Sequence, residues 1–417
     1  MKDLPAEKGY NVETVWNLEA EALEQISQLR HKHLIRRIAA FKRGSEHFIL
    51  FEWADGGTLR DVWKTYATEH LDLDSNRIIG LLEQLRGLAG ALCALHNTNS
   101  KTKTALATRA IMRGTLTSYK RTNSRSAALS SVGGFDNEKA PGPGVTIKLD
   151  VPSEDDYGDY DDDNDDDDYD SDDSETSSGD EHWLHGDLKP DNILKFGGST
   201  CLGTLKIADL GLAKQHKYKT ADRHDLTKQR YATEQYEAPE VITNSSQPRS
   251  RRYDVWSMGC IIFESVVWLL YGYNGLKTFY KEENYIDTSM ETLYFTAAKS
   301  QRTAKVSDIV KWWLGQILKD DPECNQPTRT ALGDLLRLVQ NELLVVALPE
   351  PNMNPEDLVH CRADSAMLLE GLERIWENAK DKSSYRFTGI DRTEVARPTP
   401  LGEKKRINLS PSTASRA

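Results

Sequence analysis

The sequence predicts an α+β fold, in which a few short strands accompany a larger number of helices. The run His47–Phe51 is short, aromatic and aliphatic, and it follows the turn-like tripeptide Arg43-Gly44-Ser45. It therefore predicts a β-hairpin with residues 34–41. The longest helical signal comes next, because apolar residues recur between Ile78 and Leu95 at the spacing of one helix face.

Other elements follow from the same patterns in chain order. Residues 12–29 predict an amphipathic helix before the hairpin, since acidic residues alternate with apolar ones at helical spacing. Asp55-Gly56-Gly57 then breaks the pattern, and two helices are expected after it, the second carrying the stripe described above. Near the C-terminus, residues 353–380 end in one more amphipathic helix.

The composition changes abruptly between residues 100 and 181. The first half of this segment is rich in Ser, Thr, Lys and Arg, and the second half, residues 154–181, holds 17 acidic residues and no Lys or Arg. Neither half can bury enough apolar surface to offset the entropy lost on ordering, so we expect a disordered insertion. The formal net charge of −12 comes from this segment, because elsewhere 53 basic residues slightly exceed 48 acidic ones.

The cysteine content and hydropathy exclude several classes of protein. Five cysteines lie far apart with no C-x-x-C pair, which argues against a disulfide scaffold and a zinc site and favours a reducing compartment. No apolar leader follows Met1, and the longest apolar stretch, residues 260–271, is interrupted by Glu264. We therefore expect an intracellular protein, cytoplasmic or nuclear, with no membrane and no nucleic-acid partner.

Four short motifs carry the functional information. The first is the ten-residue run His185-Gly186-Asp187-Leu188-Lys189-Pro190-Asp191-Asn192-Ile193-Leu194. Asp209 follows in Ala208-Asp209-Leu210-Gly211, and after it come Ala238-Pro239-Glu240 and the run Asp254–Gly259. In order and spacing these resemble the catalytic loop, metal-binding loop, activation-segment end and central C-lobe helix of eukaryotic-type protein kinases.

The resemblance implies a bilobal protein kinase-like fold with a small, partial β N-lobe and a mainly α-helical C-lobe. Among these kinases, the sequence most resembles serine/threonine kinases, in particular fungal kinases that carry His-Gly-Asp-Leu-Lys-Pro. The expected organisation is as follows: a partial N-lobe at 1–54, the start of the C-lobe at 55–99, the insertion at 100–181, the C-lobe at 182–348, a helical extension at 349–396 and a disordered tail at 397–417.

Phosphoryl transfer from ATP requires a positioned alcohol and neutralised phosphate charge. The resemblance assigns Asp187 as the carboxylate that orients the substrate hydroxyl and accepts its proton. Lys189, two residues later, is expected to lie on the transferred phosphate. Asn192 and Asp209 supply the hard oxygen ligands that Mg²⁺ prefers.

Upstream residues extend the resemblance to the nucleotide site. Glu52-Trp53-Ala54 looks like the hinge, so the backbone of Glu52 and Ala54 is expected to bind adenine. Glu21 is the expected partner of the ATP-anchoring lysine, with Glu24 or Glu19 as competitors, and Lys2 lies where that lysine belongs. No glycine-rich loop precedes Lys2, which makes the N-lobe appear truncated; the G-x-G at residues 142–144 falls inside the insertion.

Several positions carry structural expectations. Gly186 replaces the arginine that often precedes the catalytic Asp, so control by activation-loop phosphorylation is less expected, and Leu210 replaces the usual Phe and should still pack. Asp254 is expected to hold the catalytic loop's backbone. Glu240 is expected to pair with a C-lobe arginine such as Arg329. Thr233 occupies the place where serine/threonine kinases hold a threonine against the catalytic Asp.

Three functions are compatible with these residues. The preferred one is phosphorylation of protein serine or threonine hydroxyls. A pseudokinase or scaffold is the alternative favoured by the absent glycine-rich loop, and a small-molecule kinase is a third, against which Lys189 and Ala238-Pro239-Glu240 argue. The acidic run is interpreted first as a solvated spacer, and second as a contact for a basic partner or for the basic half of its own insertion.

Overall fold

The computed structural model describes residues 20, 23–44, 46–65, 73–97, 183–198, 202–210, 214–215, 234–244, 249–285, 292–298, 302–325, 327, 329–350, 353–392 and 394–401. The expected insertion at 100–181 lies outside these residues, as do most of the expected helix at 12–29 and the residues Lys2, Glu21 and Thr233.

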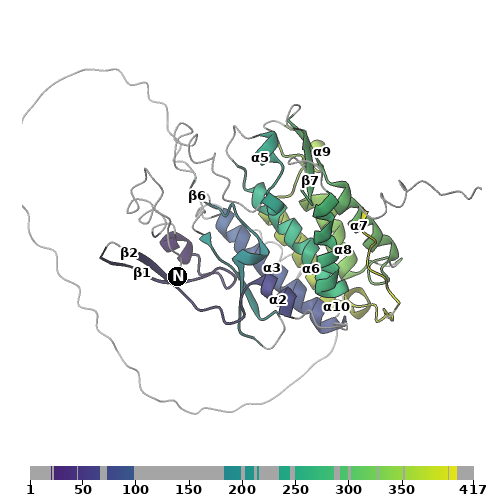
Figure 1. Cartoon of the computed structure of the whole chain (residues 1–417), viewed down its shortest axis with the longest axis horizontal. Coiled ribbons are helices and arrows are strands. Elements are labelled where there is room, and N and C mark those ends of the chain that lie inside the picture. The colour runs from purple at the N-terminus through teal and green to yellow at the C-terminus, as the bar shows by residue number, and fades with distance from the viewer. Residues whose placement is uncertain are drawn as a thin grey trace, which may run out of the picture. The chain divides into compact units, whose positions relative to one another are not determined.

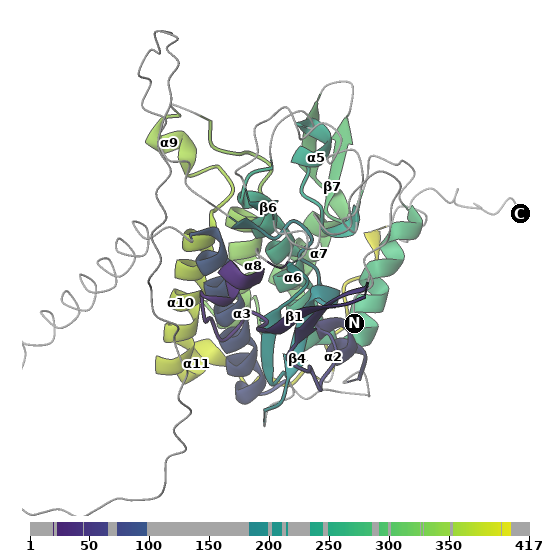
Figure 2. The ribbon, with the colours of Figure 1, turned by 90° about the vertical axis from the view of Figure 1, so that its left-hand side faces the viewer.

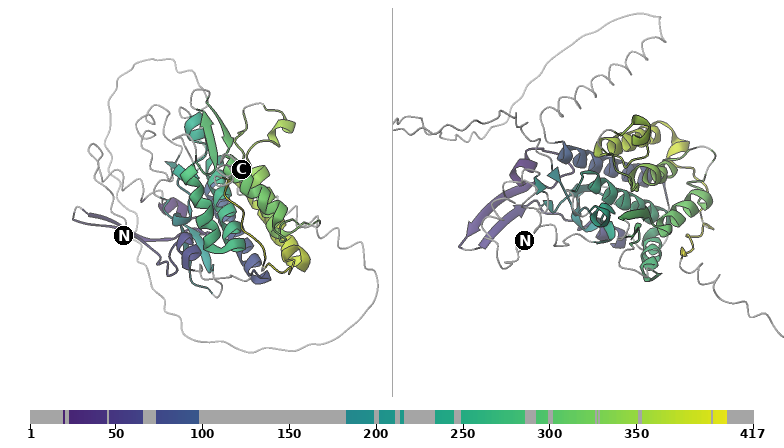
Figure 3. Two further views of the ribbon diagram at one scale, coloured as in Figure 1. Left: turned by 45° about the vertical axis from the view of Figure 1, so that its right-hand side comes forward. Right: turned by 90° about the horizontal axis from the view of Figure 1, so that it is seen from above.

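The predicted hairpin is confirmed, with its first strand a few residues later than expected. Strand β1 (Arg37–Arg43) pairs antiparallel with β2 (Glu46–Phe51), and Gly44 in the turn has a φ of 63° that favours glycine. Phe41 and Phe48 stack across the strands with ring centroids 5.2 Å apart. In Figure 3 the hairpin is the pair of purple strands at the edge of the helical body.

The two predicted helices after the hairpin are α2 (Leu59–Thr65) and α3 (Ser75–His96). Helix α3 begins at Asp74, whose carboxylate accepts hydrogen bonds from two backbone N–H groups of the first turn. The apolar stripe predicted for this helix is buried along its length. It forms part of one hydrophobic core that includes residues around the four motifs described above.

Helix α6 (Arg252–Tyr280) passes through the middle of this core (Figure 1). Nearly every side chain from Tyr253 to Leu270 is buried, and Gly272 interrupts the helical geometry with a φ of 64°. The other helices that the structure describes with bounds are α5 (Glu240–Thr243), α7 (Asp308–Asp320), α8 (Ala331–Leu338), α9 (Pro355–Leu358), α10 (Ser365–Asp381) and α11 (Ser383–Arg386).

The strands within the described residues form two-stranded antiparallel sheets. Besides β1–β2, the pairs are β3 (Trp183–Leu184) with β6 (Lys214–Gln215), β4 (Ile193–Phe196) with β5 (Thr204–Ile207), and β7 (Phe295–Ala298) with β8 (Thr303–Val306). The described part of the fold is therefore mainly helical, with its strands confined to short antiparallel pairs, in agreement with the predicted α+β class.

Helix α10 is the predicted C-terminal amphipathic helix, and it lies along α3 (Figure 2). Leu368 and Leu372 are fully buried in the common core. At the same contact, the guanidinium of Arg86 lies 3.8 Å from the ring centroid of Trp376. Helix α10 is thus packed into the same core as the helices that precede it.

Residues 387–392 and 394–401 contact the helical body, and the last five of them belong to the segment expected to be a disordered tail. Buried carboxylates accept hydrogen bonds from this segment at three places. Glu323 accepts from Thr388, Asp321 from Arg392, and Glu282 from the Leu401 backbone N–H at 2.6 Å. Buried carboxylates need hydrogen-bond partners, and this segment supplies them. The Pro/Ser-rich composition of the segment did not reveal these contacts.

Helices α3 and α6 are long and apolar enough to cross a membrane by length and composition alone. In the structure 61% and 89% of their apolar windows, respectively, are buried against protein. Such burial is the ordinary property of helices in a hydrophobic core.

Candidate active site

The ten-residue run at 185–194 forms a loop between β3 and β4. Pro190–Asn192 makes a single 3-10 turn, closed by a hydrogen bond of 2.9 Å from the Asn192 N–H to the Lys189 carbonyl. Proline suits the first position of this turn, because its φ is fixed and the missing N–H would have no partner there. The turn brings residues 187, 189 and 192 to one side of the loop.

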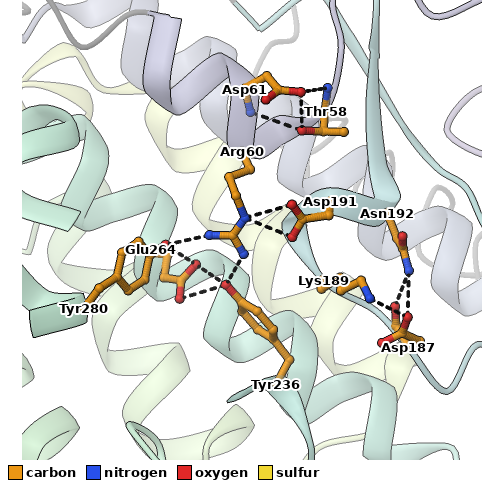
Figure 4. A network of polar contacts seen from close by, with 10 residues as sticks. All are labelled: Thr58, Arg60, Asp61, Asp187, Lys189, Asp191, Asn192, Tyr236, Glu264 and Tyr280. Atoms are coloured by element: carbon orange, nitrogen blue, oxygen red, sulfur yellow. Dashed lines mark hydrogen bonds and ion pairs between the residues drawn. The ribbon is translucent and has the colours of Figure 1, made fainter. Parts of the chain in front are cut away.

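The side chains of Asp187, Lys189 and Asn192 meet in this loop (Figure 4). Lys189 Nζ lies 2.8 Å from Asp187 Oδ2. Asn192 Nδ2 donates to the Asp187 carbonyl at 2.8 Å and to its carboxylate at 3.1 Å, so the Oδ1 atom of Asn192 faces away from Asp187. Asp187 and Asn192 are both buried to the same extent, 7% exposed.

The β4–β5 hairpin brings Asp209 to the same loop. Ile193 pairs with Ile207, which places the residues just outside the hairpin opposite one another. The Ala208 N–H donates to the Asn192 carbonyl at 2.8 Å, and His185 Nε2 donates to the Ala208 carbonyl at 2.9 Å. Asp209 follows directly, with a φ of 58° that is unusual for a residue with a side chain and typical of functional loops.

Asp254, at the start of α6, holds the backbone of the loop at residues 185–192, as we expected from the sequence. Its carboxylate is fully buried and accepts hydrogen bonds from the N–H groups of His185 at 2.8 Å and Gly186 at 2.9 Å. His96 Nε2 donates a third at 2.9 Å. Burial alone would raise the pKa of Asp254, but the hydrogen bonds from His96 and the Gly186 N–H, together with electrostatic attraction to His96 and His185, lower the pKa below its usual value.

Two departures from the usual kinase motifs have local explanations. Gly186 adopts a φ of 78°, a conformation that favours glycine and allows its N–H to reach Asp254. Leu210, in the place of the usual Phe, is buried in the core, as expected. Both substitutions are therefore compatible with an intact loop.

The expected pairing of Glu240 with Arg329 is wrong. Glu240 makes a bidentate ion pair with Arg362, at 2.7 and 3.0 Å, and the Arg362 side chain is fully buried. Arg329 instead pairs with Asp334 at 2.8 Å on an exposed surface. Arg362 lies in the loop before α10, and this loop places it next to Glu240. The position of the loop depends on how α10 packs on the core, so the sequence alone does not reveal this partner.

The linker at residues 52–57 lies beside β4, the strand that follows the loop at residues 185–192. The Gly56 N–H donates to the Lys195 carbonyl at 3.1 Å, and the Lys195 N–H donates to the Gly57 carbonyl at 2.9 Å. A side chain at Gly56 would meet Lys195 within 2.5 Å, so the close approach requires glycine. This arrangement holds Gly56 and Gly57 against β4, and Ala54, two residues before Gly56, is half-buried.

The Glu52 side chain has structural partners. Lys206 Nζ lies 2.6 Å from Glu52 Oε1, and the Arg36 N–H donates to the same oxygen at 3.0 Å. Any contact of Glu52 with a nucleotide would therefore use its backbone, as the resemblance implies. Lys2 and Glu21 lie outside the described residues, so their predicted roles stay predictions.

The donor set fits a divalent cation. Mg²⁺ binds carboxylate and amide oxygens while keeping some of its waters and phosphate ligands. Asp209 offers a carboxylate and Asn192 the Oδ1 atom that is turned away from Asp187. These two residues would hold the ion, which would neutralise phosphate charge next to Asp187 and Lys189.

A second polar cluster around Arg60 was not predicted from the sequence. Arg60 contacts Asp191, Tyr236 and Tyr280, which lie 131, 176 and 220 residues away along the chain. Both tyrosines donate to Glu264 in α6. Separations of this size leave no local sequence signal, so only the tertiary structure could reveal the cluster.

Glu264 gives this cluster a measurable pH dependence. Burial raises the pKa of Glu264 to about 7 from its ordinary value of 4.5, although the hydroxyl of Tyr294 and the charge of Arg60 act in the opposite direction. Because the folded state keeps a proton that the unfolded state releases, stability should fall as pH rises from about 4.5 to 7. The Glu264→Gln variant should lack this loss, which amounts to roughly 3 kcal/mol.

Urea denaturation of both proteins between pH 5 and pH 8 checks this expectation. The exposed Glu377→Gln, in α10, serves as the control and should keep the wild-type slope. Parallel pH profiles of wild type and Glu264→Gln would contradict the raised pKa.

Comparisons with known proteins agree with this site. Residues 180–332 match the family model of the protein kinase domain. The chain is similar to "Mitogen-activated protein kinase mpkA" of Aspergillus fumigatus, with 32% identity over 120 residues that cover 29% of this chain and 25% of the relative. It is also similar to "Serine/threonine-protein kinase chk-2" of Caenorhabditis elegans, with 30% identity over 137 residues that cover 31% of this chain and 25% of the relative.

A third relative is "Serine/threonine-protein kinase tousled-like 2" of Xenopus tropicalis, with 40% identity over 86 residues that cover 19% of this chain and 12% of the relative. The matched part of the chain thus spans about a quarter or less of the length of these relatives. The motifs, their geometry and these similarities agree that residues 180–332 match a protein kinase domain and are similar to eukaryotic serine/threonine kinases.

Proposed function

We propose that this protein transfers the γ-phosphate of ATP to serine or threonine hydroxyls of protein substrates, using a bilobal kinase fold. The observation that carries the proposal is the convergence of Asp187, Lys189 and Asn192 in one loop, with Asp209 joined to that loop by the β4–β5 hairpin. Relatives that are named serine/threonine kinases support the same substrate class.

Each residue has a defined part in the proposed reaction. Asp187 orients the substrate hydroxyl and accepts its proton as the hydroxyl oxygen bonds to the γ-phosphorus. The bond from that phosphorus to the bridging oxygen breaks, and ADP leaves. Lys189 stabilises the charge of the transferred group, and Asn192 with Asp209 would hold Mg²⁺, which would neutralise phosphate charge.

We also propose that the protein acts inside the cell. The cysteines that the structure describes, Cys93, Cys260, Cys324 and Cys361, are free and buried thiols. Free thiols are typical of a reducing compartment.

The test compares wild type with Asp187→Asn, using radiolabelled ATP, Mg²⁺ and a generic basic protein, followed by phosphoamino-acid analysis. We expect wild type to label serine or threonine, and Asp187→Asn to lose at least about a hundredfold in rate. The variant should keep the rise in melting temperature that Mg-ATP produces. The control is Asp308→Asn, an exposed carboxylate at the start of α7, which should transfer phosphate normally.

Two results would contradict the proposal. One is wild-type protein that binds Mg-ATP without transferring phosphate, which is the behaviour of a scaffold. The other is full activity in Asp187→Asn, which would place the chemistry elsewhere.

A further inference from the structure

Arg60 lies in helix α2, and its side chain contacts the loop at residues 185–192 (Figure 4). Its Nε atom lies 2.9 Å from both carboxylate oxygens of Asp191. Asp191 stands between Pro190 and Asn192 in the turn that shapes the site, so a group that fixes Asp191 also restrains Asn192. The Arg60 side chain is 20% exposed, and the contact is therefore partly shielded from water.

The other end of the same guanidinium contacts the segment that leads into Ala238-Pro239-Glu240. Arg60 Nη2 donates to the Tyr236 hydroxyl at 3.0 Å, and Nη1 donates to the Tyr280 hydroxyl at 3.5 Å. Tyr236 belongs to the short turn Glu234–Tyr236. One side chain therefore bridges two segments that are 45 residues apart in the sequence, at Asp191 and Tyr236.

Glu264 fixes the orientation of the tyrosine hydroxyls. Its fully buried carboxylate accepts hydrogen bonds from Tyr236 at 2.9 Å, Tyr280 at 3.0 Å and Tyr294 at 2.8 Å. A hydroxyl has one proton to donate, so a tyrosine that gives it to Glu264 presents only lone pairs to Arg60. While Glu264 is ionised, the direction of each hydrogen bond in the network is thereby set.

The planar guanidinium suits this bridging position. Its five N–H donors form a rigid fork that can serve the carboxylate of Asp191 and the hydroxyl of Tyr236 together. A lysine ammonium at residue 60 is a compact point charge and could not reproduce the fork. Movement of Tyr236 away from Glu264 would remove the acceptor of Nη2 and loosen the hold on Asp191.

We propose that Arg60 is a positioning residue that couples residues 234–236 to the catalytic loop, an inference that rests on the proposed function. When Tyr236 is hydrogen-bonded to Glu264, Arg60 holds Asp191. This contact keeps Asn192 and Asp187 in their observed arrangement. A displaced Tyr236 releases Asp191, and the loop loses this restraint. The segment before Ala238-Pro239-Glu240 thus controls the order of the phosphate-transfer site through one guanidinium.

The first test needs no activity. Amide hydrogen exchange is measured without nucleotide in wild type, Arg60→Met, Arg60→Lys and Tyr236→Phe, for peptides covering residues 186–196 and 234–240. Arg60→Met should speed exchange in both peptides, and Tyr236→Phe should speed it in the catalytic loop although it lies outside that loop. The control is Arg86→Met, which removes a half-buried arginine packed on Trp376 and should leave both peptides unchanged.

The second test separates positioning from packing by kinetics. Arg60→Met should lower kcat about tenfold or more while KM for ATP changes less than about twofold, and Arg60→Lys should recover only part of the loss. The Arg60→Met/Tyr236→Phe double variant should be no slower than the slower single variant, because both changes cut the same link.

Equal behaviour of Arg60→Met and Arg86→Met, in exchange and in kcat, would overturn the inference and leave Arg60 as a packing residue. Additive losses in the double variant would overturn it as well. If wild type transfers no phosphate but Arg60→Met still loosens the catalytic loop, the coupling stands and the proposed function is wrong.

Discussion

Replacing Arg362 by methionine should cost the protein about 3–5 kcal/mol of unfolding free energy. The Arg362 side chain is fully buried, makes both of its charged contacts with Glu240, and donates from Nε to the Val345 carbonyl at 2.8 Å. Methionine replaces only the aliphatic stem of the arginine, so the variant leaves the Glu240 carboxylate, which is 8% exposed, without its counter-charge. An uncompensated buried charge is the reason for the large effect.

Urea denaturation of Arg362→Met measures this cost, and Arg329→Met provides the matched control. Arg329 is the partner that the sequence suggested, but it lies on the surface with 71% of its side chain exposed, so its loss should cost less than about 1 kcal/mol. The Glu240→Gln/Arg362→Met double variant should recover part of the loss, because it removes both charges. A larger cost for Arg329→Met than for Arg362→Met would contradict the observed pairing.

The Asp254→Asn variant should lose about 3 kcal/mol or more of stability and most of the proposed phosphate-transfer activity. The carboxylate accepts hydrogen bonds from two loop N–H groups and from His96. An asparagine amide would replace one acceptor with a donor, so one of these groups would face another N–H. The catalytic loop would then lose its attachment to α6.

The pH dependence distinguishes this effect from simple loss of packing. The pKa of Asp254 in the folded protein is below its ordinary value of 3.8, so its contribution to stability is present above that pH. It is lost as pH falls through the lower folded-state value. The stability difference between wild type and Asp254→Asn should therefore shrink below about pH 4.

Circular dichroism melts across this pH range, together with a phosphate-transfer assay at neutral pH, provide the measurements. Asp308→Asn, whose carboxylate is 59% exposed, is again the control and should show neither effect. An Asp254→Asn protein with wild-type stability at pH 7 would show that the buried carboxylate does not hold the loop.

The parts of the site that the sequence predicted are local. Asp187, Lys189 and Asn192 lie within six residues, and a 3-10 turn suffices to bring them together. Asp209 joins them through a single hairpin. The hairpin near the N-terminus and the long helix α3 were also predictable, because their periodic apolar residues decide which face is buried.

Long-range partners could not be predicted in this way. Glu240 needed a buried cation, but the sequence contains several arginines in its C-terminal part and gives no measure of their distances in space. Arg362 is the partner because the loop before α10 returns to the core while Arg329 faces solvent. Residues 397–401 also depend on a long-range partner. Their polar composition does not reveal that the Leu401 N–H donates a hydrogen bond to Glu282.

The sequence by itself determined the kinase motifs, the order of the elements and the cluster at residues 187–192, because each depends on neighbours a few residues apart. The tertiary structure alone decided which charges meet in the interior. Burial makes an unpaired charge costly, so the fold selects partners by where the packed helices bring them, as it does for Glu240 with Arg362 and for Arg60 with Asp191.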